Sequence, residues 1–169
     1  MILQYDRSVI TEYALPLDQS APHHSGPKTA EARYFFFTGN TRYGIQNLEY
    51  DAYRRRWLVA VYPGKKERFS NYPLYCIDGS VAPVMQTLLG RAGEKGLVLS
   101  HTEGGIQDKN PSVRGYRFSH GDTGMVSFGD GLYYFSHHGS NREEKSYWST
   151  LTLYRAGEDG SDEPFVAVE

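Results

Sequence analysis

The sequence predicts an all-β domain made of antiparallel sheets, and three observations support this fold class. Aromatic residues make up 14% of the chain, 14 Tyr among them, and broad aromatic side chains pack well on strands. The 18 Gly and 8 Pro interrupt the chain often, as short strands joined by turns require. No window carries a long helical period. With 169 residues, 39% of them hydrophobic, the chain fits one globular domain with a buried core.

The expected strands follow one another along the chain. Apolar runs at 44–50 and 57–62 are joined by a polar turn at 51–56, which predicts a hairpin. A tighter hairpin is predicted at Gly129-Asp130-Gly131, because Asp-Gly is the strongest short hairpin signal. Residues 147–155 alternate as a half-buried strand does. The other expected strands are 74–77, 84–89, 96–100 and 113–119.

An internal repeat is the most informative sequence feature. Residues 34–41 and 116–123 share the pattern Y-x-F-x-x-G-[ND]-T, at an offset of 82 residues. Residues 3–9 and 75–81 share D-x-S-V after an apolar strand, at an offset of 72 residues. Two matches in the same order predict a duplicated unit. The predicted organisation is a single domain, 1–169, with repeat 1 at about 2–64, repeat 2 at about 74–139 and a partial repeat at 147–169.

These repeats of about four strands resemble the blades of a β-propeller, in which sheets radiate around a channel. The resemblance is one of architecture, because the WD, Kelch and Asp-box patterns are absent. It implies a partial β-propeller, since about 4 to 8 blades are needed to close a ring. Three alternatives follow: the chain is part of a longer protein that holds the missing blades, it closes a ring as a homo-oligomer, or it forms a small β-sandwich or barrel.

Charge and cysteine content limit the partners. The formal net charge of −2 gives no overall field that attracts nucleic acid, so we expect none as a partner. The single Cys76 excludes an intrachain disulfide, and its apolar surroundings predict a buried, inert thiol. The longest apolar stretch, 57–62, is too short to span a bilayer, and no signal peptide is visible. We expect no membrane partner and a cytoplasmic location by default, with a processed or truncated secreted protein as the alternative.

Basic residues gather in the middle of the chain, and the chain ends in an acidic segment. The simplest interpretation is a solvated turn followed by a solvated loop. The functional alternative is an anion or phosphate site. The basic residues concerned are Arg54, Arg55, Arg56, Lys65, Lys66 and Arg68.

The propeller resemblance implies that the loop entering each inner strand shares a face with the loop after the second strand. In repeat 1 this places residues 40–43 beside the loop at 62–66. The ligand-binding candidates on this face are Asn40, Arg42, Tyr43, Lys65 and Lys66.

In repeat 2 the same argument brings three histidines and one aspartate together. Imidazole titrates near neutral pH and serves in acid–base chemistry, so His120, Asp122 and His137 are the catalytic candidates, and His138 is a ligand-binding candidate. The alternative is turn chemistry for the Gly-Asp-Thr segment. Adjacent His on a strand point to opposite faces and rarely ligate one metal. We therefore expect no metal and no cofactor.

Carboxylates offer a further route to chemistry, since glycoside hydrolysis needs two of them. Three of the four candidates lie in or before Gly turns, which explains them without catalysis. Glu49 lies on a strand between two apolar neighbours and is expected to face water. No established catalytic motif is present. The aspartates considered are Asp51, Asp78, Asp122 and Asp130.

Together these features predict a binding or interaction module whose ligand is a carbohydrate or a protein. Aromatic faces stack on sugar rings, and Tyr and Trp anchor protein interfaces. Two alternatives stay open: a carbohydrate-active or other hydrolytic enzyme that uses the His/Asp loops, and a structural domain of a larger chain. The aromatic residues in or beside loops are Tyr43, Tyr53, Phe69, Tyr72, Tyr147 and Trp148.

Overall fold

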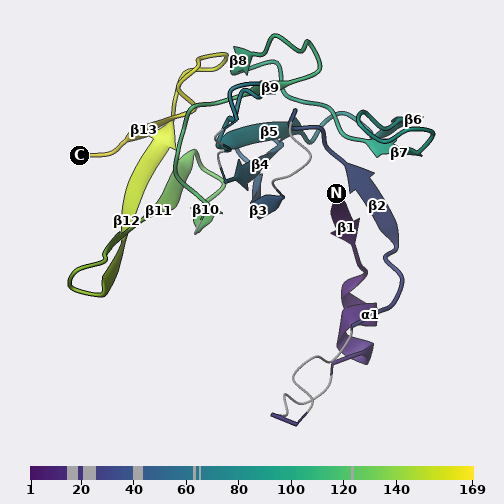
Figure 1. The fold of residues 1–169 in the computed structure, drawn as a ribbon, viewed down its shortest axis with the longest axis horizontal. Coiled ribbons are helices and arrows are strands. Elements are labelled where there is room, and N and C mark those ends of the chain that lie inside the picture. Colours follow the sequence, from purple (N-terminus) through teal and green to yellow (C-terminus); the bar gives the residue numbers. More distant parts are fainter. Residues whose placement is uncertain (15–18, 21–25, 40–43, 63, 65, 123) are drawn as a thin grey trace. The chain divides into compact units, whose positions relative to one another are not determined.

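The computed structural model describes residues 1–14, 19–20, 26–39, 44–62, 64, 66–122 and 124–169 (Figure 1). Thirteen strands and one short helix occur in these ranges, so the predicted all-β class is confirmed. The chain divides into two compact units. Unit 1 comprises residues 1–36 and 83–98, and unit 2 comprises residues 37–82 and 99–169. No helix in the described part of the chain is long and apolar enough to span a membrane.

Unit 1 contains one four-stranded sheet in the order β1-β2-β7-β6. The pair β2–β7 is parallel, and the other pairs are antiparallel. The short helix α1 (Arg7–Glu12) begins after Asp6, whose carboxylate accepts a hydrogen bond from the Ser8 amide over 2.7 Å. The strands are β1 (Ile2–Gln4), β2 (Ala32–Phe35), β6 (Val84–Thr87) and β7 (Lys95–Val98).

Unit 2 contains three sheets, each antiparallel. The first is a three-stranded meander of β3 (Ile45–Asp51), β4 (Arg56–Val61) and β5 (Leu74–Asp78). The second pairs β8 (Ile106–Gln107) with β9 (Arg114–Gly115). The third is a four-stranded meander of β10 (Met125–Ser127), β11 (Leu132–Asn141), β12 (Ser146–Ala156) and β13 (Phe165–Ala167).

The core of unit 2 lies between the β3–β4–β5 sheet and the β10–β13 sheet. Leu58 of β4 and Leu74 of β5 are completely buried there, and Cys76 is buried as the sequence predicts. Aromatic rings from the other sheet meet these side chains and pack edge to face with one another, which is the favoured geometry for such pairs. The buried aromatic residues of this cluster are Tyr116, Tyr133, Phe135, Tyr154 and Phe165.

The predicted repeat is not confirmed by the strand pairing. Asp6 and Asp78 do make the same local turn, since each accepts hydrogen bonds from the amide and hydroxyl of the Ser two residues on. Beyond this turn the two segments differ. Asp6 begins α1, and β1 pairs with β2, whereas β5 pairs with β4. The described strands form sheets of four, four, three and two strands, and they show no closed propeller.

The prediction that the polar turn at 51–56 is solvent-exposed is wrong for its first and its last residue. Asp51 and Arg56 pair across β3 and β4 and are buried, at 0% and 5% exposure. A solvated turn was expected because charged side chains are rarely buried unless they are paired, and here Asp51 and Arg56 are paired over 2.9 Å. Burial comes from β11, whose Tyr133 donates a hydrogen bond to Asp51 over 2.9 Å. Arg55, at the tip of the turn, is exposed with a φ of 50°.

Candidate functional site

The hairpin of β11 and β12 is longer than the strands beside it. Its register runs over ten residue pairs, from Leu132 opposite Arg155 to Asn141 opposite Ser146. On one edge β10 pairs only with residues 133–135, and on the other edge β13 pairs only with residues 154–156. Figure 1 shows the turn of this hairpin extending beyond the ends of both neighbours. We call residues 137–141 and 146–152 the outer hairpin.

The two faces of the outer hairpin carry different side chains, because cross-strand partners share a face. One face continues from the core and carries His137 opposite Thr150 and Gly139 opposite Trp148. The other face carries Tyr147 and, further in, Leu151 opposite Ser136. Tyr147, Leu151 and Trp148 are 86%, 68% and 57% exposed. Large apolar side chains on both faces are therefore open to solvent.

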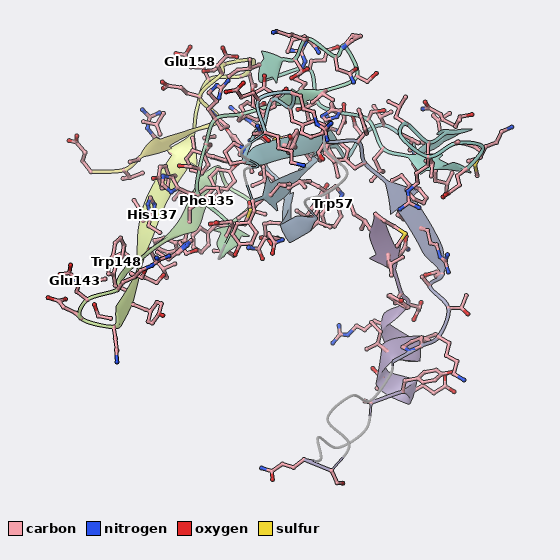
Figure 2. The ribbon with its side chains drawn as sticks, in the orientation of Figure 1. Trp57, Phe135, His137, Glu143, Trp148 and Glu158 are labelled. Carbon is pink, nitrogen blue, oxygen red and sulfur yellow. The ribbon has the colours of Figure 1, made fainter. Side chains whose placement is uncertain are left out.

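Trp148 lies across the backbone of its partner strand. A Cβ atom on Gly139 would come within 2.1 Å of the indole ring, so the ring occupies the space that any other residue would fill. In Figure 2 Trp148 lies near the turn of the hairpin, together with Glu143, whereas His137 and Phe135 lie further in. Glycine at position 139 thus leaves the space that the indole occupies, and more than half of the Trp148 side chain stays exposed.

His120 and His137 meet at the base of the outer hairpin. Their ring centroids are 3.7 Å apart with an interplanar angle of 36°. Tyr154 stacks beside His137, and its hydroxyl lies 3.2 Å from His137 Nε2. Burial lowers the pKa of His120, and repulsion from His137 lowers it further, while Asp122 acts in the opposite direction. The pair thus favours a neutral imidazole at position 120.

His138 points to the opposite face of β11, as the alternation of a strand predicts. Its Nδ1 lies 3.9 Å from Asp122 Oδ1, and its side chain is half-exposed. The structure therefore brings the four candidates of repeat 2 together, but as two separate pairs. No group of three or more His, Cys, Asp or Glu suited to a metal ion occurs among the residues that the structure describes.

The loop that carries His120 and Asp122 is held by β3. Asn47 Nδ2 donates to the carbonyl oxygens of Gly121 and Asp122 over 2.7 and 2.9 Å. Glu49 was expected to face water, but its Oε1 accepts a hydrogen bond from the Ser127 amide of β10 over 2.9 Å. These side chains therefore fix β10 and the histidine loop against β3. The position of Glu49 between two apolar neighbours is the sequence signal that set this side chain apart.

Most ligand-binding candidates of repeat 1 lie outside the described residues, namely Asn40, Arg42, Tyr43 and Lys65. Lys66 is half-buried in a turn, where its carbonyl accepts hydrogen bonds from the Phe69 amide and from Asn71 Nδ2. Its described contacts are therefore those of a turn residue. The face that the propeller resemblance implied for repeat 1 stays a prediction.

Comparison of the chain with family models, with curated proteins and with solved structures finds no match.

Proposed function

We propose that the chain is an interaction module that binds another polypeptide along the open edge of β12, by pairing with an extended strand. The observation that carries the proposal is the outer hairpin, where ten-residue pairing continues well beyond the strands that flank it. An isolated two-stranded ribbon is at best marginally stable in water. A third strand on this edge supplies the missing hydrogen bonds.

The open edge lacks the features that normally prevent pairing. Proteins protect exposed edges with charged residues, proline or bulges. Residues 146–152 have the sequence S-Y-W-S-T-L-T, without a charge, a proline or a glycine. The β12 pairing shows no bulge over this stretch. An unprotected edge that is rich in aromatic and β-branched residues favours strand addition.

The partner that fits this edge best is β12 of a second copy of the chain. Antiparallel pairing about a two-fold axis at Ser149 sets Tyr147 of each copy opposite Leu151 of the other. The same register sets each Trp148 opposite a Thr150. Aromatic–aliphatic and aromatic–β-branched pairs stabilise adjacent strands, and no like charges meet in this register. The most exposed apolar side chains of the hairpin are thereby covered by an isologous contact.

A charge-exchange experiment tests this contact. Ser149→Lys and Ser149→Glu each bring like charges together at the two-fold axis, so we expect each variant alone to be monomeric by light scattering coupled to size exclusion. The unsubstituted chain is expected to be a dimer that dissociates on dilution. An equimolar mixture of the two variants restores the dimer, because opposite charges then meet. Ser112→Lys, in the exposed loop between β8 and β9, is the matched control and keeps the parent mass.

Two results would count against self-pairing: a parent chain that stays monomeric at high concentration, or a Ser149→Lys variant with the parent's mass. The carbohydrate alternative gives a different pattern. Sugar stacking on the exposed indole of Trp148 is lost in Trp148→Ala and is retained in Ser149→Lys, since Ser149 points to the opposite face of the hairpin. Glycan binding that follows this pattern in a monomeric chain would replace the protein partner by a carbohydrate.

A further inference from the structure

A cavity of about 290 Å³ opens in unit 2 beside the turn between β3 and β4. On one side it is lined by the arginines of this turn, and on the other by the acidic loop that joins β12 and β13, where Figure 2 labels Glu158. Its volume is close to the lower limit for small-molecule sites. Its lining includes Arg54, Arg55, Arg56, Tyr116, Glu158 and Asp159.

Arg56 lines this cavity and carries a buried donor without a partner. Its side chain is 6% exposed, and its Nε donates to Asp51 Oδ2 over 2.9 Å. Its Nη2 is buried and has no hydrogen-bond partner in the described part of the chain. An unsatisfied charged donor is costly in a protein interior, and such groups are rare in native structures. An acceptor that reaches this donor would remove that cost.

Arg54 places a second guanidinium at the same cavity. Its side chain is 15% exposed and is anchored by a hydrogen bond from Nη2 to the Gly157 carbonyl. Its Nε lies 2.9 Å from Asp159 Oδ1, although the N–H does not point at that oxygen. Asp159 is 89% exposed, and exposed ion pairs contribute little to stability. The ion pair between Asp159 and Arg54 is therefore weak, and another anion can replace the carboxylate.

We infer that this cavity binds a small oxyanion, a carboxylate or a phosphate, that takes the place of the Asp159 carboxylate. The anion accepts hydrogen bonds from Arg54 and from Arg56 Nη2, whose planar guanidinium groups suit the oxygens of both ligand classes. Exposed Arg55 at the cavity adds a third positive charge. Glu158 and Asp159 oppose the anion, and Asp159 acts as an internal competitor. This inference does not depend on the proposed pairing of β12.

If Asp159 competes with the anion, removing its charge raises the affinity for the anion. A purely structural ion pair between Arg54 and Asp159 does not predict this increase. Isothermal titration with inorganic phosphate, and separately with succinate, is carried out at constant ionic strength. Asp159→Asn is expected to raise the affinity for the bound anion by about 1.4- to 5-fold, the range that the removal of an exposed ion pair allows. Asp162→Asn, in the same loop but outside the cavity lining, leaves the affinity unchanged.

Arginine variants complete the test. Arg54→Gln is expected to weaken binding at least tenfold, and exposed Arg55→Gln weakens it less without disturbing the buried groups. Arg91→Gln is the control, because Arg91 forms an exposed ion pair with Glu94 in unit 1. Binding of phosphate but not succinate identifies a phosphate site, and the reverse a carboxylate site. The inference is overturned if neither anion binds, if Asp159→Asn fails to raise affinity, or if Arg54→Gln and Arg55→Gln both keep the parent's affinity.

Discussion

Tyr133 of β11 donates a hydrogen bond to Asp51 of β3 over 2.9 Å, and both side chains are completely buried. The same carboxylate oxygen accepts a hydrogen bond from Arg56 Nε, also over 2.9 Å. Burial raises the pKa of Tyr133, and its bond to Asp51 raises it further, so the phenol keeps its proton and remains a donor. This carboxylate thus joins the two large sheets of unit 2 within the core.

Replacing Asp51 is expected to be strongly destabilising. Asp51→Ala leaves the Arg56 charge buried without its partner, which lowers the free energy of unfolding by about 3–5 kcal/mol. Tyr133→Phe removes only the neutral donor and costs about 1.5–3 kcal/mol. Urea unfolding measures both values. Asp162→Ala, at an exposed position, serves as the control. A cost for Asp51→Ala no greater than that of the control would contradict this account of the core.

Local sequence signals predicted several strands and hairpins, because these depend on neighbours in the chain, but of the strand expected at 113–119 only β9 (Arg114–Gly115) forms. Gly129-Asp130-Gly131 does form the turn before β11, where Asp130 accepts a hydrogen bond from the Leu132 amide. Residues 84–89 and 147–155, expected as strands, contain β6 and most of β12. The turn at 51–56 was misjudged because Tyr133, 82 residues away, buries its first residue.

The candidate site was predictable only in part. Alternation correctly separated His137 from His138, and the histidine loops do meet. The support for these loops was not predictable, because Asn47 acts on backbone carbonyls more than 70 residues distant, and no local pattern marks such a bond. The outer hairpin was likewise missed, since its exposure depends on where β10 and β13 end. The sequence placed Trp148 beside a loop, but it did not indicate that the edges of β11 and β12 are open there.

Glu49→Ala is expected to loosen β10 from β3. The Ser127 amide then loses a charged acceptor, which we expect to cost about 1–3 kcal/mol of the free energy of unfolding. Amide hydrogen exchange at Ser127 measures the local effect and is expected to accelerate. Glu67→Ala, at an exposed position, should leave this exchange unchanged. Unchanged protection of Ser127 in Glu49→Ala would show that the bond does not hold β10.

The free energy of unfolding is expected to fall as the pH drops below about 6.5. Burial, aided by His137, lowers the pKa of His120 in the folded chain, so the unfolded chain binds the proton more readily in this range. His101 contributes with the same sign, because burial also lowers its pKa. Urea unfolding between pH 5 and 7 is the measurement. His120→Gln should reduce the slope, and a slope equal to the parent's would contradict the assigned direction.

Cys76 is expected to react with thiol reagents only when the core opens. The side chain is 2% exposed, and burial raises the pKa of its thiol, so little thiolate is present. Labelling kinetics with a chromogenic disulfide therefore report on unfolding. Asp51→Ala should accelerate labelling in proportion to its loss of stability, whereas Asp162→Ala should not. Rapid labelling of the intact parent chain would show that the core around Cys76 is open.

Gly139→Ala is expected to weaken dimer formation while leaving the free energy of unfolding nearly unchanged. The new methyl group displaces the Trp148 indole, which is 57% exposed and therefore free to swing away. Because Ala also reduces the entropy lost on folding by about 0.5–1 kcal/mol relative to Gly, the free energy of unfolding changes by less than about 1 kcal/mol. Dimer formation, measured by light scattering, weakens because Trp148 no longer faces Thr150 of the other copy.

Gly115→Ala is the matched comparison for this prediction. Its Cβ would lie 2.7 Å from the Tyr72 side chain, which is only 4% exposed and has no space to move into. Overpacking of this kind costs about 1–3 kcal/mol of the free energy of unfolding. If Gly139→Ala destabilised the chain as much as Gly115→Ala, Trp148 would be part of the folded core. Equal stability with a weaker dimer would assign it to the contact between copies.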